Sequence, residues 1–462
     1  MFKTFKRPKS DYMSLFALMF PIILQNIATS SLGLADTLMV GVLGQNELAG
    51  LAQANVVFFI IQLFTFGIQS GCAVLISQYW GKRDVKTINR VMGMGFYTSL
   101  IFTAIVSSVI YFFPNAVMSL TTNDPNIIDC AARYGRIVAY SFVLNSITMV
   151  YLGAQRSAEN PKLGMTVLTT SMLVNVFLNW VLIFGKLGAP KMGLEGAAVA
   201  TFVSRVVEIL MAAVYALIID KRLPLNIKCF FAPGSVICAD YFKYATPVVL
   251  NETLWGFGYS MYSVIFGHMA GASNIVAAYS ITGNVERIIL VLCQATATAS
   301  AVMIGKSIGR GDKKPDVLSL GKWLLEMSVA CGLFSALLVV AVNVFLMDSV
   351  VFRVFSVTPE AEKIAYMMMT VIALRMVFKS YNTTCIVGVL RGGGNVRLGM
   401  IIDIVFMYLY SIPAGCLAAF AFGASITVVF AIVSSEDAVK AFVGAYILKD
   451  GSWVRDITRE IE

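Results

Sequence analysis

Long apolar stretches, each about as long as a membrane-spanning helix, recur along the whole chain. The runs 333–347 and 405–422, for example, contain no charged residue. A helix needs about 20 apolar residues to cross a bilayer, whereas the strands of a membrane barrel alternate apolar and polar residues in segments of about ten. The pattern therefore predicts an all-α membrane protein with twelve transmembrane helices, near residues 14–43, 53–78, 91–113, 131–155, 164–185, 194–219, 240–269, 276–304, 321–347, 363–389, 398–421 and 423–448.

Composition agrees with this prediction. Hydrophobic residues make up 58% of the 462 residues and charged residues 13%, against about 45–50% and about 25% in soluble domains. Twelve spans with short connections leave no room for a separate soluble domain. The eight cysteines show no CxxC pair, so we expect neither a disulfide framework nor a zinc site. The basic N-terminus has no small-residue cleavage site, and we expect the first span to be retained.

Positive charge is distributed asymmetrically among the predicted loops. With the N-terminus placed inside, 24 Lys and Arg residues fall in inside segments, 6 in outside segments and 5 within spans. Because Lys and Arg are retained on the cytoplasmic side, this bias predicts a multi-pass protein of the cell membrane with both termini in the cytoplasm. The net charge of +9 then reflects topology. We expect the lipid bilayer as a partner and no nucleic acid.

The chain also repeats itself, because three short motifs recur in order at offsets of 226, 228 and 235 residues. They are 20–24 with 246–250, 80–84 with 308–312, and 153–156 with 388–391. The repeats predict two bundles of six spans each. Since six is even, both bundles enter the membrane from the same side, as parallel repeats. We therefore expect an N-terminal lobe over 1–220, a cytoplasmic linker over 221–239 and a C-terminal lobe over 240–462.

Motifs spread over nearly the whole length resemble those of the multidrug and toxic compound extrusion (MATE) family. No single motif is decisive, but their order along twelve spans is specific. They are Pro21 with Gln25, the segments 35–37, 40–41 and 43–44, Gln78–Asp84, Asn175 with Asn179, 182–185, Gly193–Thr201 and Gly388–Gly394. The resemblance implies two lobes around a central cavity. It also implies export of organic, often cationic, compounds in exchange for inward Na⁺ or H⁺.

Asp36 is the foremost candidate for a functional site, since ionisable groups at membrane depth are costly and usually functional or paired. It lies about 22 residues into the first span, with no basic residue close to it in sequence. Asn175 and Asn179 are four residues apart and share a helix face. In the family, the positions matching Asp36, Asn175, Asn179 and Thr201 bind the coupling cation. The alternative is that Asp36 caps a local break in the backbone.

One feature of this chain limits what the resemblance implies about the coupling ion. Some family members carry Asp where this chain has Asn179, which lowers the charge of the site and leaves Na⁺ and H⁺ both open. No metal is expected beyond Na⁺ at Asp36, and no other cofactor.

Pro21 removes a helical hydrogen bond in the same span as Asp36. In the family a proline here is associated with bending of the first helix, so Pro21 is either a hinge or a tolerated proline.

Glu252, in the seventh predicted span, is the candidate acid of the second lobe. The family pairs this acid with another on the tenth span, where this chain has Lys379-Ser380-Tyr381. That departure argues against a second Na⁺ site. Glu252 therefore has a coupling role, faces cationic substrate, or pairs with Lys379.

Other charged residues within the spans are expected to form structural pairs. Opposite charges lie close together in sequence at Glu286–Arg287, at Arg205–Glu208 and in the segment 436–440. Asp403 and Arg375 are expected to pair between the tenth and eleventh spans. The single histidine, His268, lies near the end of a span and is expected to be a surface residue.

These observations favour a secondary active transporter that exports small molecules by alternating access and acts as a monomer. A related alternative is a flippase of lipid-linked oligosaccharides or lipids, although that class would show a strongly cationic cavity. An enzyme would need a clustered nucleophile, metal or acid–base set, and the sequence shows none. A channel would need a repeated, ring-like filter, which is also missing from the sequence.

Overall fold

The computed structural model describes residues 7–355 and 358–460, and within them every regular element is a helix. The helices form two compact units. We call residues 21–249 the N-terminal unit, and residues 250–459 together with residues 7–20 the C-terminal unit. Helix α1 (Lys9–Gly41) contains Pro21, and helix α10 (Ser235–Gly267) contains Pro247. Both helices contribute residues to both units, because the unit boundaries fall after Phe20 and after Val249.

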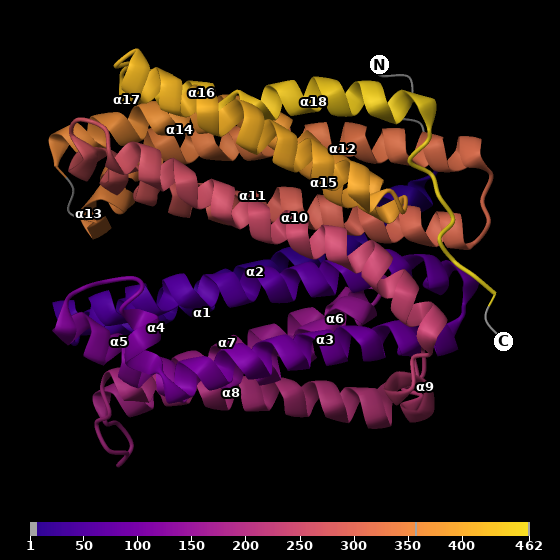
Figure 1. Ribbon diagram of the computed structural model, residues 1–462, viewed down its shortest axis with the longest axis horizontal. Coiled ribbons are helices and arrows are strands. Elements are labelled where there is room, and N and C mark those ends of the chain that lie inside the picture. Colours follow the sequence, from indigo (N-terminus) through magenta and orange to yellow (C-terminus); the bar gives the residue numbers. More distant parts are fainter. Residues whose placement is uncertain (1–6, 356–357, 461–462) are drawn as a thin grey trace. The chain divides into compact units, whose positions relative to one another are not determined.

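The N-terminal unit consists of long helices that pack side by side (Figure 1). Helices α2, α3, α6, α7 and α8 contact one another in this unit, and α5 packs on α2 and α8. The elements between α1 and α10 are α2 (Gln45–Lys82), α3 (Val85–Phe112), α4 (Pro114–Met118), α5 (Pro125–Val138), α6 (Ser141–Ser157), α7 (Pro161–Phe184), α8 (Leu194–Val214) with the π-helical segment η1 (Tyr215–Ile219), and α9 (Ile227–Phe231).

The C-terminal unit is built around α14, which contacts α11, α12, α17 and α18. Several of its helices contain or continue as π-helical segments. Its elements after α10 are α11 (Ala272–Gly309), α12 (Lys314–Ala341) with η2 (Val342–Val351), α13 (Phe352–Phe355), α14 (Pro359–Thr383) with η3 (Thr384–Arg391), α15 (Val396–Val405), η4 (Phe406–Ser411), α16 (Ile412–Cys416), η5 (Leu417–Ala421), α17 (Ile426–Ser434), α18 (Glu436–Ile447) and the 3₁₀ turn η6 (Leu448–Asp450).

Helix ends follow the local chemistry of the sequence. Asp84, Asp124 and Thr358 each accept a hydrogen bond from a backbone N–H in the first turn of α3, α5 and α14, which satisfies a donor that the helix leaves free. Proline opens α4, α5, α7 and α14, where its missing N–H costs nothing. Gly185 ends α7 in the left-handed conformation at φ 68°, which glycine adopts without steric cost.

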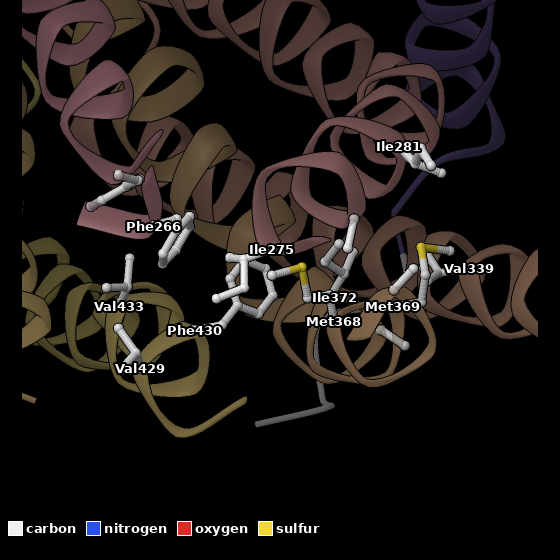
Figure 2. Close-up of a cluster of buried hydrophobic side chains, with 14 of the residues drawn as sticks. Phe266, Ile275, Ile281, Val339, Met368, Met369, Ile372, Val429, Phe430 and Val433 are labelled. Atoms are coloured by element: carbon white, nitrogen blue, oxygen red, sulfur yellow. The ribbon is translucent and has the colours of Figure 1, made fainter. Parts of the chain in front are cut away.

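The apolar side chains that face inward form a separate core in each unit. In the N-terminal unit, Phe58, Tyr134 and Ile183 belong to one buried cluster. In the C-terminal unit, Phe266 of α10, Met368 of α14 and Phe430 of α17 belong to another (Figure 2). Many large apolar side chains are exposed instead, including Phe345 and Leu409. A lipid-facing surface accounts for such exposure in helices of this length.

The expected spans lie on helices, but two of them are interrupted: 131–155 bends between α5 and α6, and 423–448 is divided at Ser435 between α17 and α18. The expected span 131–155 is the pair α5 and α6, which meet at 50°. The join expected near 422–424 is a break between η5 and α17, where Gly423 has a φ of 57°. In the described residues, eight helices are long and apolar enough to cross a membrane, and the bent pair makes a ninth. The other three expected spans fall on α10, on α14 with η3, and on α17 with α18, and these helices do not meet the same measure of length and apolarity.

Close packing between helices depends on glycine at a few positions. A Cβ atom on Gly93 of α3 would lie 1.9 Å from the backbone oxygen of Phe230, which belongs to the short helix α9. Gly33 of α1, in contrast, has open space where its Cβ would be. The two glycines therefore differ in what they do for the fold, although both lie inside long helices.

We predict that Gly93→Ala lowers the thermal stability of the purified protein, because neither α3 nor the backbone of Phe230 can make room for a methyl group without moving. Gly33→Ala is the matched control and should keep or raise stability, since alanine is favoured over glycine in a helix by about 1 kcal/mol. Fluorescence-detected size-exclusion chromatography after heating measures both. Equal midpoints for Gly93→Ala and the parent would contradict the prediction.

Candidate ion-binding site and buried charge networks

Four predicted site residues meet in the N-terminal unit and form a closed ring of hydrogen bonds. Asn179 Nδ2 donates to Asp36 Oδ1 at 2.5 Å and to Asn175 Oδ1 at 3.1 Å. Asn175 Nδ2 donates to Thr201 Oγ1 at 3.3 Å, and Thr201 Oγ1 donates to Asp36 Oδ2 at 3.5 Å. We call these four residues the Asp36 ring. Three helices, α1, α7 and α8, each supply a part of it.

The hairpin of α7 and α8 places the neutral members of the Asp36 ring. Asn175 and Asn179 are one turn apart on α7, so their side chains lie one above the other. Gly196 lets the start of α8 approach the end of α7, because a Cβ there would lie 2.8 Å from the backbone carbonyl of Leu182. Thr201 follows just over one turn later on α8 and thereby reaches Asn175.

Burial isolates the Asp36 ring from water. Asp36 is 5% exposed, Thr201 7%, and the two asparagines 0%. Among the residues that the structure describes, no Lys or Arg side chain forms an ion pair with Asp36. The Oδ1 atom of Asn179 is also buried and accepts no hydrogen bond. An orphaned buried acceptor is costly and calls for a missing partner. The ring therefore has one uncompensated negative charge and one free acceptor oxygen.

A second polar cluster lies one to two turns further along α8. Glu208 is fully buried and forms an ion pair with Arg205. It also accepts hydrogen bonds from Ser171 Oγ at 2.7 Å and from Asn145 Nδ2 at 3.3 Å. The expected pairing of Arg205 with Glu208 is confirmed. Since the pair is balanced and its carboxylate is satisfied by two other helices, we assign it to the packing of α6, α7 and α8.

In the C-terminal unit, Glu252 pairs with a different partner from the one considered in the sequence. Its Oε1 atom lies 2.6 Å from Arg391 Nη2, at the end of η3. The alternative that Glu252 pairs with Lys379 is wrong, because Lys379 Nζ lies 3.7 Å from Asp437 Oδ1. Helix α14 presents Lys379 toward α18, where a carboxylate is available. Glu252 is therefore neutralised by Arg391.

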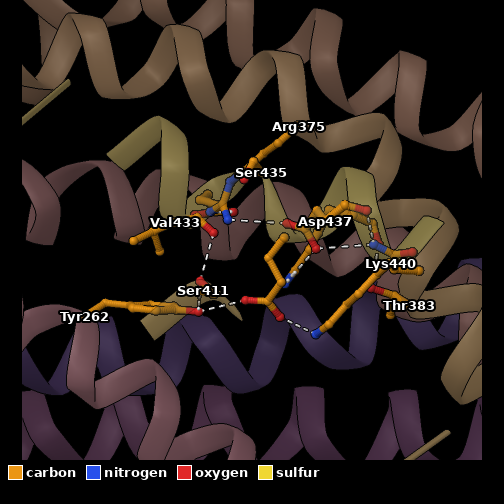
Figure 3. Close-up of polar contacts among 12 residues, drawn as sticks. Tyr262, Arg375, Thr383, Ser411, Val433, Ser435, Asp437 and Lys440 are labelled. Atoms are coloured by element: carbon orange, nitrogen blue, oxygen red, sulfur yellow. Dashed lines mark hydrogen bonds and ion pairs between the residues drawn. The ribbon is translucent and has the colours of Figure 1, made fainter. Parts of the chain in front are cut away.

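A network of charged side chains from four helices lies in the same unit (Figure 3). Arg375 Nη2 lies 2.5 Å from Glu286 Oε1, and Arg375 Nη1 lies 3.5 Å from Asp437 Oδ2. The expected pair of Asp403 with Arg375 is wrong, since Asp403 Oδ1 instead lies 2.7 Å from Lys440 Nζ. Arg287 does not neutralise Glu286, because it follows Glu286 directly on the helix and points to a different side, where it is exposed.

The sequence contained a partial signal for this network. Arg375 and Lys379 are four residues apart on α14, and Glu436 and Lys440 are four apart on α18, so each pair shares a helix face. Charged side chains at membrane depth are usually paired, so the charged faces of α14 and α18 are expected to pack against each other or against other charged side chains. The expected closeness of 436 and 440 is confirmed by their ion pair. Which helices face each other, however, could not be read from spacing.

The remaining candidates occupy simpler positions. Pro21 is buried inside α1 and is the first residue of the N-terminal unit. His268 is exposed, as expected, and its Nδ1 atom lies 2.9 Å from the carbonyl oxygen of Val264. Neither residue contacts the Asp36 ring. A set of long apolar helices that enclose hydrogen-bonded charges is the architecture of a membrane transporter.

Comparison with known proteins gives the family. The MatE family model matches residues 21–181 and 247–417, and the chain belongs to this family. A probable multidrug resistance protein NorM from Thermotoga maritima is 25% identical over 403 residues, which are 86% of this chain and 84% of that protein. The multidrug resistance protein MdtK of Yersinia enterocolitica is 23% identical over 406 residues, 87% of each chain.

Solved structures share the fold. A MOP superfamily transporter from Pyrococcus furiosus superimposes with a TM-score of 0.85 at 18% identity, over 95% of both chains. The eukaryotic MATE transporter AtDTX14 superimposes with a TM-score of 0.84 at 17% identity, over 96% of both. The predictions of an all-α multi-span membrane protein, of a MATE family efflux transporter, and of a transporter rather than an enzyme are confirmed.

The buried pair of Glu252 and Arg391 gives a stability prediction. We expect Glu252→Gln and Arg391→Met each to destabilise the protein by about 3–5 kcal/mol, because each removes one charge of a buried ion pair. The double variant should lose less than the sum of the two losses, since it leaves no charge behind. Thermal unfolding in detergent measures the stability losses of the two single variants and of the double variant against the parent. Additive losses would show that the two groups do not depend on each other.

Proposed function

We propose that the protein exports small organic molecules in exchange for inward movement of H⁺ or Na⁺, and that the Asp36 ring binds the coupling ion. The observation that carries this proposal is the ring itself. A carboxylate that is 5% exposed is held by neutral donors from two other helices, next to an amide oxygen without a partner. Within the described part of the chain, the Asp36 carboxylate thus has no positively charged partner, and Asn179 Oδ1 has no hydrogen-bond donor.

Either ion fits this arrangement. A proton on Asp36 would remove the charge and supply a donor for a neighbouring oxygen. A sodium ion would take oxygen ligands, which hard cations prefer, from Asp36, Asn175, Asn179 and Thr201. In both cases the net charge of the ring becomes zero. Since the ring joins α1 to α7 and α8, binding acts on the relative positions of three helices.

Coupling requires that the ion binds two conformations with different affinity. Pro21 is placed to contribute, because a proline inside a helix removes one backbone hydrogen bond and permits bending. It lies in the same helix as Asp36, about four turns earlier. We propose that α1 bends at Pro21 when the state of the Asp36 ring changes.

The proposal includes a twelve-span architecture of two parallel repeats with both termini in the cytoplasm. The family model supports the repeat, because its two matched segments begin at residues 21 and 247, which is the offset of 226 between Pro21 and Pro247. The division into lobes stays a prediction, with an N-terminal lobe over 1–220, a linker over 221–239 and a C-terminal lobe over 240–462. The orientation that the loop charge bias indicates also stays a prediction. We also propose that the protein acts as a monomer.

For the substrates we propose small organic molecules, often cationic. Two relatives from Thermotoga maritima and Yersinia enterocolitica are described as multidrug resistance proteins. In this chain, Glu252 is balanced by Arg391, so the proposal that Glu252 faces a cationic substrate requires the ion pair to open. Substrate-dependent loss of that pair is a condition of any role for Glu252 in binding.

We predict that Asp36→Asn abolishes ion-driven efflux, because the ring then has no charge for an incoming cation to neutralise. Folding should be kept, since asparagine can still join the ring of hydrogen bonds. Ethidium efflux from proteoliposomes with an imposed ion gradient is the measurement. Asp348→Asn, an exposed acid in η2, is the matched control and should transport like the parent. Full efflux by Asp36→Asn would exclude the coupling role.

A second experiment selects the ion. Proteoliposomes with the parent protein are given either a Na⁺ gradient at equal pH or a pH gradient without Na⁺. We expect one of the two gradients to drive ethidium efflux in the parent and neither to do so in Asp36→Asn. If a gradient drives the variant as well as the parent, the coupling site lies elsewhere.

A further inference from the structure

Apart from the pair of Glu252 and Arg391, the charge network of the C-terminal unit divides into two groups that differ in balance. The first group consists of Arg375, Lys379, Glu286 and Asp437, which are joined by ion pairs of 2.5, 3.5 and 3.7 Å. It has two positive and two negative charges, and Asn382 Nδ2 donates to the backbone oxygen of Asp437 at 2.6 Å. This group is neutral when every member is ionised.

The second group is Lys440, which is labelled in Figure 3, with two carboxylates, Asp403 and Glu436, and we call these three residues the Lys440 triad. Lys440 Nζ lies 2.7 Å from Asp403 Oδ1 and also forms an ion pair with Glu436 Oε1. The Lys440 and Glu436 side chains are 5% and 8% exposed, and that of Asp403 is 17% exposed. One ammonium faces two carboxylates, so the fully ionised triad has one excess negative charge.

Apart from Lys440, the two carboxylates contact a hydroxyl and an amide group, and Lys379, which acts on Asp403 from nearby, forms its ion pair with Asp437. Tyr262 Oη donates to Glu436 Oε2 at 2.9 Å, and Ser411 Oγ lies 2.9 Å from Tyr262 Oη. Of the other ionisable groups near Asp403, Cys385 is uncharged as a thiol and Lys379 is engaged by Asp437. Within the described part of the unit, no further Lys or Arg contacts either carboxylate. Burying an excess charge is expensive.

Asn251 of α10 provides an independent sign that something is missing. It is 2% exposed, and its Nδ2 atom donates to Asp403 Oδ2 at 3.2 Å. Its Oδ1 atom is buried and has no hydrogen-bond partner. An amide can serve either state of a carboxyl group, because its N–H donates to the carboxylate and its oxygen accepts from the acid. A proton on Asp403 would provide the donor that Asn251 Oδ1 lacks.

We propose that the Lys440 triad is a second proton-binding site, separate from the Asp36 ring. One proton from water adds to a carboxylate oxygen of Asp403 or Glu436, and the net charge of the triad rises from −1 to zero. No electron is transferred and no other bond is broken. A proton fits better than a metal cation, because the ammonium of Lys440 already lies between the two carboxylates and would repel a metal cation.

Proton binding at the triad acts on the contacts between three helices. Asn251 belongs to α10, Asp403 to α15, and Glu436 and Lys440 to α18. When one carboxylate is neutral, Lys440 is attracted mainly by the other. The site is therefore a second place where a proton changes helix contacts, in a different unit from the one that contains the Asp36 ring. It goes beyond the proposed coupling site and does not depend on it.

The test uses the full-length Asp36→Asn protein in liposomes, so that the Asp36 ring contributes no signal. Infrared difference spectra are recorded between about pH 9 and about pH 6, a window in which an exposed carboxylate stays ionised. We expect a protonated-carboxyl band of one carboxyl group. Adding Asp403→Asn or Glu436→Gln should abolish the band, because each leaves Lys440 with a single carboxylate and no excess charge. Adding Asp348→Asn should leave it unchanged.

Three results would overturn the proposal. The first is the absence of the band in the Asp36→Asn protein, and the second is its persistence in a folded Asp403→Asn or Glu436→Gln protein. The third is a band that disappears at constant pH when choline is replaced by Na⁺, because the triad would then be a metal-cation site. Two independent variants keep the test decisive if one does not fold. Efflux assays of Asp36→Asn report on the proposed coupling site alone, so the two proposals can fail separately.

Discussion

A carboxylate or an ammonium group inside a membrane-spanning protein has no water around it, and its charge must be met by other groups of the protein. Several buried ionisable residues of this chain meet that constraint through side chains that come from neighbouring helices. Glu252 needs Arg391 of η3, Glu208 needs donors from α6 and α7, and Asp36 needs α7 and α8. Charge satisfaction and helix packing are therefore the same problem in this fold.

The two units stabilise their buried charges in different ways. The N-terminal unit surrounds Asp36 with neutral amide and hydroxyl groups, so the charge is stabilised by hydrogen bonds but not cancelled. The C-terminal unit sets charge against charge in a network across α11, α14, α15 and α18. A repeated helical plan thus supports two kinds of electrostatics. Proton or cation binding is favoured wherever the local sum of charges is negative.

The close approach of helices decides which buried polar and charged groups lie near enough to interact. Gly196 allows α8 to approach the end of α7 closely enough for Thr201 to reach Asn175. Gly388 similarly lies against the backbone oxygen of Ala297, where a Cβ would be 3.1 Å away, and so brings η3 close to α11. Small residues at such crossings are typical of membrane helices, which pack through van der Waals contact rather than through exclusion of water.

The sequence by itself indicated the helical, membrane-spanning class, because apolar length is a local property of the chain, and the spacing of Asn175 and Asn179 placed them on one helix face. The order of its motifs indicated the MATE family, and that resemblance named the four members of the Asp36 ring. The sequence also indicated that Arg205 meets Glu208, three residues away on one helix. It did not determine that Asp403 meets Lys440 or that Glu252 meets Arg391. Those partners lie 37 and 139 residues apart, on helices whose mutual rotation is set by the packing of the whole unit. Only the tertiary structure decides which charged faces meet, because a charge in a spanning helix accepts whichever opposite charge the packing brings within reach.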